Sequence, residues 1–379
     1  MKSRNFATCM SSSPNVSVGD PSSTYGMIDS PPVAAGNDGL GRFLLLAASF
    51  ITLSCVYAYP ASGYHVIKKI PLPGDGGWDY VTADSAARRL YVSHNEIVQV
   101  LDLDTLAVVG QIPDTLGVHG IALAPTLGRG FTSNGKAGTV TLFDLSTLKP
   151  LTQVKAGQNP DALVYDPFTQ RVFAFNGRSH DATAIEAATG KILGQIALDG
   201  KPEFTVADGS GTVYVNLEDK GTLVRIDAQK LKVLRRWPLA PCEEPSTMAM
   251  DRAHERLFIG CGNKKLVVMD PEQGQVVATL PIGDHVDATV FDAEKQLIFT
   301  SNGEGTVTVI HEDAPDHYTV VDTVPTQAGA RTEALDTHTH RLFLPTAELG
   351  PRPDPTTEQP HPRPAIKPGT FTLLVVGAE

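Results

Sequence analysis

The chain has 379 residues, 41% of them hydrophobic, and a formal net charge of −11. The hydrophobic fraction is sufficient for a globular core, and the 34 Gly and 28 Pro residues indicate many turns. The acidic charge argues against sequence-independent binding to DNA or RNA, because such binding needs a basic surface that replaces phosphate counterions. A chain of this length can hold several domains, although all-β proteins of this size often form one continuous body.

The chain begins with two segments that we expect to lie outside the folded part. Residues 1–42 are rich in Ser, Pro and Gly without a periodic pattern, so they are predicted to be disordered or to precede the true start, for which Met27 is a candidate. Residues 43–58, FLLLAASFITLSCVYA, follow Arg42 and are short for a membrane span. They end in small residues typical of signal-peptide cleavage, so we predict removal near Ala58 and export to the periplasm or out of the cell.

Two alternatives stay open for this apolar segment. One is an uncleaved membrane anchor, and the other is a lipoprotein modified at Cys55, which residues 52–54 disfavour because they form a poor lipobox. In the favoured interpretation the mature chain has no membrane span.

The rest of the chain repeats with a period of about 42 residues. FTSNGKAGTVTL at 131–142 and FTSNGEGTVTV at 299–309 begin 168 residues apart, which is four periods. Acidic residues recur at turns with the same period, and Asp favours such turns because its carboxylate accepts hydrogen bonds from the following backbone amides. These turn residues are Asp102, Asp144, Glu186, Asp227 and Asp270.

Each repeat is predicted to contain four short strands, because alternating apolar runs flank every turn and no segment has a helical period. Four antiparallel strands per repeat are typical of a β-propeller blade. The first strands are expected to begin near residues 78, 118, 160, 202, 245, 286 and 330. The seventh repeat lacks a fourth strand, and YHVIKKIPL at 64–72 has the right pattern to supply it and close the ring. Residues 64–379 are therefore predicted to form an all-β, seven-bladed propeller.

Several repeats resemble a known family. YVSHNE, FTSNGKAGTVTLFD, YVNLEDKGTLVRID and FTSNGEGTVTV resemble the repeat of the YVTN-type, YncE-like β-propellers, and CEEPSTMAMDRAHERLFIGC at 242–261 resembles a fifth-blade segment of one bacterial branch. The likeness covers residues 64–379. It implies an exported propeller without an agreed reaction, and the family's distant lactonase-like relatives imply that hydrolysis is conceivable on this scaffold.

Aligning the first strands of the blades gathers one residue of each around the channel mouth. These residues, which we call the mouth ring, are Asp79, His119, Asp161, Glu203, Ser246, Asp287 and Arg331. The ring is either a solvated polar rim or a ligand site. Converging carboxylates raise one another's pKa unless a cation or Arg331 neutralises them, and Arg331 either pairs with an acid or holds an anionic ligand.

A divalent cation is one possible ligand of the mouth ring. His119 and the ring carboxylates offer a set of donors for Ca²⁺, Mn²⁺ or Zn²⁺. The candidate metal ligands are Asp79, His119, Asp161, Glu203 and Asp287. No cofactor is certain from the sequence.

The second strands end in a further series of aligned positions, most of them Asn, which suits left-handed turns. His94 departs from this pattern and is predicted to contact a ligand at the same face. His180 and Glu218, a few residues further into these loops, are weaker candidates for the rim.

Cys242 and Cys261 remain after signal removal and flank the first two strands of the fifth repeat. An antiparallel pair places them on one face, so we predict a disulfide in an exported protein. The open alternatives are a metal site with Glu243 or Glu244, and a thiolate nucleophile whose base comes from another blade.

A Pro-rich insertion, residues 349–368, interrupts the seventh repeat. It is predicted to avoid sheet pairing and to form an extended flap near the channel mouth. It is either a passive surface loop or a lid that carries His361 and Arg363 towards the ring.

Two functions from different classes fit these features. The first is a binding or scaffold protein that takes a small ligand, a cation or a protein segment at the acidic channel mouth. The second is a metal-assisted hydrolase or lyase acting on a lactone or sugar acid, with Arg331 orienting a substrate carboxylate. The sequence has no phosphate-binding loop, GxSxG, HExxH or paired CxxC motif, so a nucleophile is not evident.

Overall fold

The computed structural model describes residues 62–354, 356, 362 and 364–378. The predicted disordered segment 1–42, the predicted signal segment 43–58, and His361 and Arg363 lie outside the described residues. Two short 3-10 turns, Pro125–Leu127 and Glu218–Lys220, are the helices found in the described part, so no helix there is long enough to span a bilayer.

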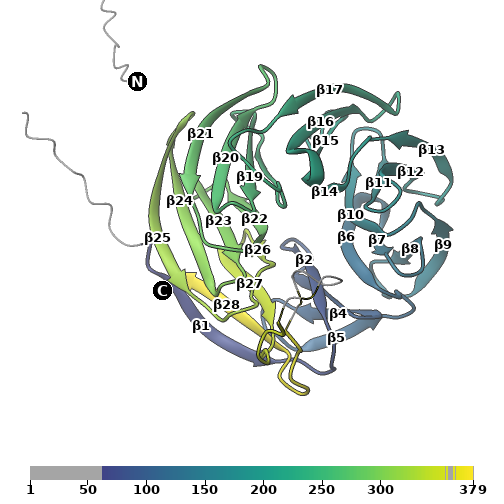
Figure 1. The fold of residues 1–379 in the computed structure, drawn as a ribbon. Helices are drawn as coiled ribbons and strands as arrows, with labels where there is room; N and C mark the ends of the chain where they lie inside the picture. Colours follow the sequence, from purple (N-terminus) through teal and green to yellow (C-terminus); the bar gives the residue numbers. More distant parts are fainter. Residues whose placement is uncertain (1–61, 355, 357–361, 363, 379) are drawn as a thin grey trace, which may run out of the picture. The chain divides into compact units, whose positions relative to one another are not determined.

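The described residues form seven four-stranded antiparallel sheets arranged in a ring (Figure 1), which confirms the predicted propeller. The innermost strands are β2 (Trp78–Asp84), β6 (Val118–Ala124), β10 (Pro160–Asp166), β14 (Pro202–Ala207), β18 (Ala249–Asp251), β22 (Val286–Asp292) and β26 (Ala334–Asp336). The second strands are β3 (Arg89–His94), β7 (Arg129–Asn134), β11 (Arg171–Asn176), β15 (Thr212–Leu217), β19 (Arg256–Cys261), β23 (Leu297–Asn302) and β27 (Arg341–Thr346).

The third and fourth strands complete each blade towards the outside. The third strands are β4 (Ile97–Asp102), β8 (Thr139–Asp144), β12 (Asp181–Glu186), β16 (Thr222–Asp227), β20 (Lys265–Asp270), β24 (Thr306–Ala314) and β28 (Thr372–Ala378). The fourth strands are β5 (Val108–Ile112), β9 (Pro150–Lys155), β13 (Ile192–Ala197), β17 (Lys232–Pro238), β21 (Gln275–Pro281), β25 (His317–Pro325) and β1 (Tyr64–Pro71).

The core lies between neighbouring blades, which explains the hydrophobic pattern of the repeat. In β3 every residue after Arg89 is buried, because both faces of a middle strand are covered by the adjacent blades. The outer strand β5 instead exposes Val108 and Val109. Aromatic side chains bridge neighbouring blades, as in the Tyr91–Phe143 pair, whose ring centroids lie 6.1 Å apart.

The recurring Asp residues fix the turns between the third and fourth strands, as predicted. Asp102, Asp144, Asp227 and Asp270 each accept hydrogen bonds from the backbone N–H groups two and three residues later. This geometry explains why the residue type recurs with the period of the blade.

The first strands of blades five and seven are shorter than predicted. β18 begins at Ala249 and β26 at Ala334, whereas the repeat predicted starts near 245 and 330. In blade five, Pro245 makes an isolated bridge with Cys261 outside the β18–β19 ladder. In blade seven, Arg331 and Thr332 donate side-chain hydrogen bonds to backbone carbonyls of blade one.

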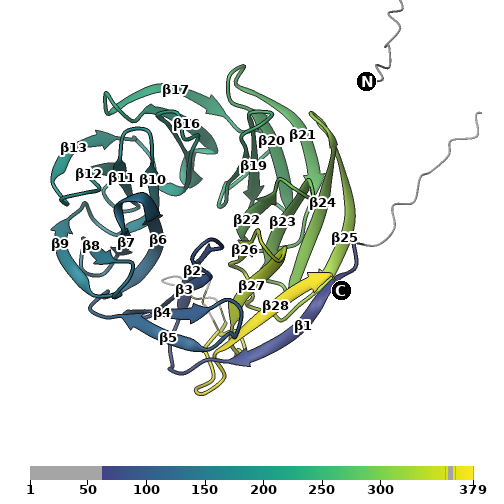
Figure 2. The ribbon, with the colours of Figure 1, turned by 180° about the vertical axis from the view of Figure 1, so that it is seen from behind.

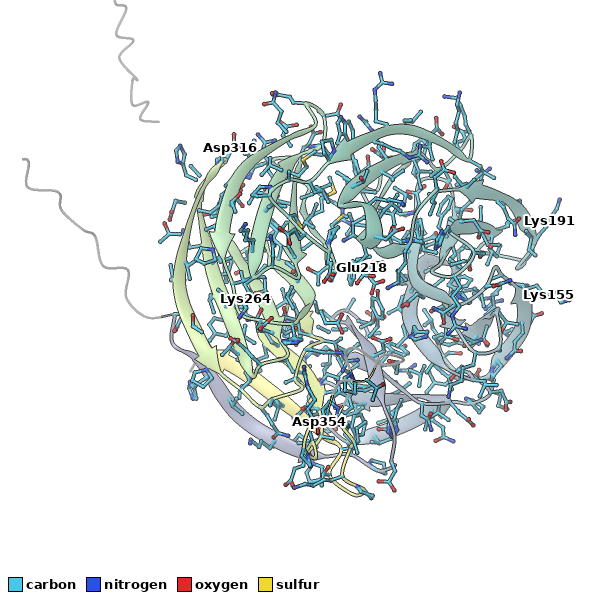
Figure 3. The ribbon with its side chains drawn as sticks, viewed as in Figure 1. Lys155, Lys191, Glu218, Lys264, Asp316 and Asp354 are labelled. Carbon is cyan, nitrogen blue, oxygen red and sulfur yellow. A yellow bond between two sulfur atoms is a disulfide. The ribbon has the colours of Figure 1, made fainter. Side chains whose placement is uncertain are left out.

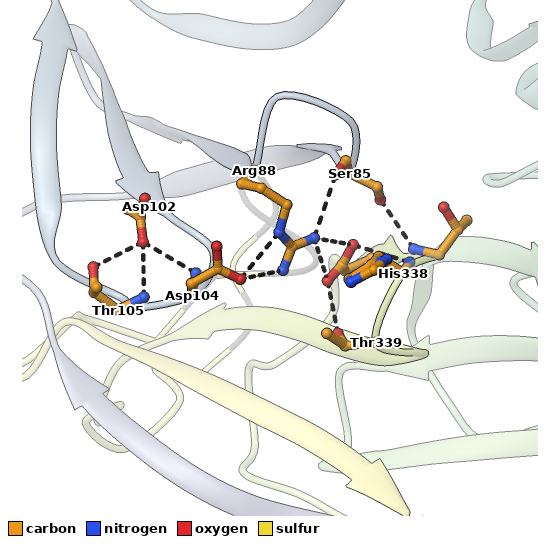
Figure 4. A network of polar contacts seen from close by, with 9 residues as sticks. Ser85, Arg88, Asp102, Asp104, Thr105, His338 and Thr339 are labelled. Atoms are coloured by element: carbon orange, nitrogen blue, oxygen red, sulfur yellow. Dashed lines mark hydrogen bonds and ion pairs between the residues drawn. The ribbon is translucent and has the colours of Figure 1, made fainter.

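The ring closes by pairing the two ends of the propeller. β1 pairs antiparallel with β28 from Tyr64 opposite Ala378 to Pro71 opposite Thr372, so the predicted closure is confirmed. Figure 2 shows the purple β1 beside the yellow β28 from behind. A side-chain network adds to this closure (Figure 4): Nη1 of Arg88, in blade one, lies 2.8 Å from both carboxylate oxygens of Asp336, in blade seven.

The two ends of the Pro-rich insertion pair with each other. Leu349 and Ile366 form an isolated antiparallel bridge, and the backbone N–H of Gly350 donates to the carbonyl of Ala365 at 2.7 Å. As expected, the described part of the insertion joins none of the seven sheets, and its base is closed by this isolated bridge between residues that are not prolines.

Cys242 and Cys261 form the predicted disulfide in blade five, with their Cα atoms 5.4 Å apart. It ties the loop before β18 to the end of β19, where the ladder between the two strands is short.

Replacing both cysteines with Ser should destabilise the protein, because the unfolded chain loses a loop constraint of about 3 kcal/mol in the chain-entropy model. The melting temperature of the double variant should fall by roughly 3 to 6 °C in calorimetry. A reducing agent should lower the melting temperature of the wild type and leave the variant unchanged. Equal melting temperatures for the two proteins would show that the bond adds nothing to stability.

Candidate ligand-binding site at the channel mouth

The mouth-ring residues occupy the same place in their strands. Asp79, His119, Asp161, Glu203 and Asp287 are each the second residue of an innermost strand, and Ser246 and Arg331 precede the two shortened strands. In the five full-length strands the register with the second strand shifts directly at this residue. Such bulges redirect a side chain out of the ladder, which explains why these polar groups face the channel mouth instead of the space between blades.

Three ring residues come close together. Nδ1 of His119 lies 2.5 Å from Oδ2 of Asp79 and 3.9 Å from Oδ1 of Asp161, and one donor atom from each residue lies within 4.8 Å of the other two. The backbone of Asp79 is held by the hydroxyl of Ser93, which accepts its N–H at 3.0 Å. We call Asp79, His119 and Asp161 the mouth triad.

His119 is positioned by a glycine as well as by its acidic partners. A Cβ atom at Gly135 would lie 2.6 Å from Nε2 of His119, so only glycine leaves room for the ring there. Burial alone lowers the pKa of His119, but the hydrogen bond to Asp79 and the charges of Asp161 and Glu203 outweigh it and raise the pKa to about 9. The imidazolium therefore carries a proton at neutral pH, and a metal ion bound at Nδ1 has to displace it.

The remaining acids of the ring have raised pKa values or basic partners. Burial raises the pKa of Asp161 to about 7; His119 opposes this rise and Asp79 adds to it. Burial, Asp161 and Glu218 together raise the pKa of Glu203 to about 8, although Lys201 opposes the rise. Negative charge at the mouth is thus costly, and a bound cation would relieve it.

Two basic residues neutralise part of this charge. Nζ of Lys201 lies 2.9 Å from Oε2 of Glu203 and also pairs with Glu218, which is at the inner edge of the ring of blades in Figure 3. Nε of Arg331 donates to Oδ2 of Asp287 at 2.5 Å, and its Nη2 donates to the carbonyl of Trp78 at 3.1 Å. Arg331 therefore pairs with a ring acid, one of the two roles expected from the sequence.

His94 is not brought to the mouth triad. Its side chain is 3% exposed and stacks on Phe371, with ring centroids 4.2 Å apart. Its Nδ1 lies 3.4 Å from Nε2 of Gln99. Burial lowers the pKa of His94, so the imidazole is neutral and packed between blade one and Phe371, the residue before β28 of blade seven.

Two contributors were not identified from the sequence. Lys201 precedes Glu203 by two residues, a spacing that places both on one side of an extended chain, and this signal could have identified it. Tyr80 lies between Asp79 and Val81 in the sequence, and no sequence pattern indicated a role for it at the site. Its hydroxyl donates to the carbonyl of Glu203 at 3.1 Å, so the side chain reaches from blade one to blade four beneath the ring.

Comparisons with known proteins agree with the fold. The family model PQQ_2, described as outer membrane protein assembly factor BamB, matches residues 136–329, which is just over half of the 379 residues. No curated protein is similar enough in sequence to count as a match.

Solved structures with this architecture have little sequence in common with it. A chain of the Kuenenia stuttgartiensis hydrazine synthase superposes with a TM-score of 0.62 at 15% identity, covering 76% of this chain and 96% of that one. The structure of U3-55K gives a TM-score of 0.68 at 7% identity, covering 82% and 99%. A chain of the mitotic checkpoint complex gives 0.67 at 11% identity, covering 92% and 99%. At these identities the likeness concerns the fold alone.

Proposed function

This chain belongs to the PQQ_2 family, described as outer membrane protein assembly factor BamB, and on that premise we propose that it is an exported binding or scaffold protein. Its ligand, a cation, a small molecule or a protein segment, binds at the acidic channel mouth. Export is proposed from the apolar segment 43–58 and its small-residue end. The resemblance of the repeats to YVTN-type, YncE-like propellers supports the same assignment.

One observation supports the mouth as the binding site more than any other. The mouth triad places two carboxylates and an imidazole with donor atoms within 4.8 Å of one another, at a polar opening whose other acids have basic partners. Oxygen and imidazole donors at such separations suit a divalent cation such as Mn²⁺ or Zn²⁺, and Ca²⁺ where the carboxylates dominate. The cation would neutralise the charge that raises the pKa of Asp161.

Cation binding at the mouth triad is tested by calorimetric titration of the chelator-treated protein at pH 8 with Ca²⁺, Mn²⁺ and Zn²⁺. At least one of the three should bind with one-to-one stoichiometry and raise the melting temperature. Asp79→Asn should weaken the binding at least about tenfold, because it removes a charged ligand. Asp316→Asn is the matched control, since Asp316 pairs with Arg256 at the outer edge of the ring of blades (Figure 3). Absence of binding by all three ions would remove the cation from the proposed ligands.

The metal-assisted hydrolase or lyase has weaker support. That mechanism assigns Arg331 to a substrate carboxylate, whereas its Nε already pairs with Asp287 and its Nη2 with a backbone carbonyl. Metal-dependent turnover of a lactone panel that is lost in Asp79→Asn would favour the enzyme over the binding protein.

A further inference from the structure

A cavity lies along the innermost strands of the propeller, and Tyr80 is among the residues that line it. This cavity of about 340 Å³ runs from Asp287, at the level of the mouth ring, to Thr337 beyond the end of β26. Its walls are mainly apolar and include Ile121, Ala162 and Phe291. A space of this size and character suits a small organic ligand.

Glu333 is the exceptional residue of this cavity. It lines the cavity, is only 4% exposed, and neither of its carboxylate oxygens makes a hydrogen bond. It lies two residues after Arg331, and the corresponding residues of the other six blades carry no charge. They are Val81, Ile121, Leu163, Thr205, Met248 and Thr289.

The polar side chains near Glu333 form hydrogen bonds or ion pairs with other residues. The hydroxyl of Thr289 lies 2.6 Å from that of Thr247, and the hydroxyl of Thr332 donates to the carbonyl of Asp79 at 2.8 Å. Of the charged groups nearby, Arg331 pairs with Asp287. Burial raises the pKa of Glu333 well above its ordinary value. The backbone N–H of Ser301 lowers the pKa only in part and makes no hydrogen bond of normal geometry with the carboxylate. A buried carboxyl group without a partner is rare in proteins and is more often found at binding sites.

Aromatic side chains line the same cavity. Tyr80 and Phe204 both line it and stack with ring centroids 5.4 Å apart and an interplanar angle of 26°. The hydrogen bond from Tyr80 to the carbonyl of Glu203 holds this pair across the channel. Aromatic faces attract organic cations, and this attraction strengthens where water is excluded.

We propose that this cavity binds the ammonium group of a small amphipathic amine, with Glu333 as its counter-ion and the apolar walls around its alkyl chain. The ammonium group supplies the donors that the Glu333 oxygens lack, and the Tyr80–Phe204 pair adds a cation–π contact. The site goes beyond the proposed function, because it uses no residue of the mouth triad.

The proposal is tested by titrating the purified full-length protein with n-butylamine and with n-butanol, which share a chain length and differ in charge. We expect butylamine to bind at least about tenfold more tightly than butanol, as is typical of a buried hydrogen bond to a charged group. Glu333→Gln should reduce this preference to within about twofold, and Glu333→Asp, which keeps the charge, should retain it. Asp79→Asn should leave it unchanged, since Asp79 belongs to the mouth triad.

Three results would overturn the proposal. The first is equal affinity of the wild type for the amine and the alcohol, a comparison that needs no variant to fold. The second is an unchanged preference in Glu333→Gln, and the third is loss of the preference in Asp79→Asn, which would place the amine at the mouth. The cation titration of the mouth triad is independent of these results, so failure at one site is distinguishable from failure at the other.

Discussion

Replacing Arg88 with Met should lower the free energy of unfolding by about 3 to 5 kcal/mol, the usual cost of leaving a buried charge without its partner. The side chain of Asp336 is fully buried, and Nη1 of Arg88 lies 2.8 Å from both of its oxygens. Although burial raises the pKa of Asp336, hydrogen bonds from Thr339 and Arg88 outweigh it, so the pKa is lowered and the carboxylate is charged. Met retains an apolar stem while removing the charge.

Urea unfolding at pH 7 measures this effect, and Asp104 provides the control. Asp104 is the second acid bound by Arg88, at 2.8 Å, but its side chain is 61% exposed. Asp104→Asn should therefore cost less than about 1 kcal/mol, as exposed ion pairs do. If Arg88→Met cost no more than Asp104→Asn, ring closure would depend on the β1–β28 ladder and not on this ion pair.

The fold was predictable from the sequence because the propeller repeats every contact once per blade. Each turn between a third and a fourth strand needs a carboxylate that accepts from the following backbone amides, so Asp102 and Asp144 recur one period apart. The last repeat lacks a fourth strand of its own, and this gap identified β1 as the partner of β28. Strand length was less predictable: Pro245 forms only an isolated bridge in blade five, whereas Pro160 and Pro202, at the same position of the repeat, begin full strands.

The candidate site was predictable only as far as the blade symmetry extends. The alignment gathers Asp79, His119 and Asp161 because blades one to three are neighbours around the channel. The alignment does not predict the orientation of each side chain. It therefore predicted that His94 contacts a ligand at the channel mouth, whereas His94 packs on Phe371. Glu333 was also missed. That its carboxylate oxygens have no hydrogen-bond partner follows from the positions of the neighbouring side chains, which the sequence does not give.

Replacing Glu203 with Gln should stabilise the protein at alkaline pH, because the pKa of this carboxyl is about 8 in the folded protein, against an ordinary value of 4.5. Between these two values the folded state holds a proton that the unfolded state has released. The wild type therefore loses stability as the pH rises from about 4.5 to 8, and the full penalty remains above pH 8. Gln carries no such penalty, so the variant should be more stable by roughly 2 to 4 kcal/mol at pH 9 and should gain nothing at pH 4.

Melting temperatures between pH 4 and 9 measure this difference, with Glu218→Gln as the matched control. Both acids pair with Lys201, so each variant removes one of the two carboxylates that bind this lysine. The charge of Glu218 adds to the raised pKa of Glu203, so Glu218→Gln should lower the penalty only in part and should change the stability by less than about 1 kcal/mol at any pH. Parallel pH profiles for wild type and Glu203→Gln would show that Glu203 is ionised at little cost. A stabilised variant would instead indicate that the charge at the mouth is maintained at the expense of folding stability, as expected of groups that bind a ligand.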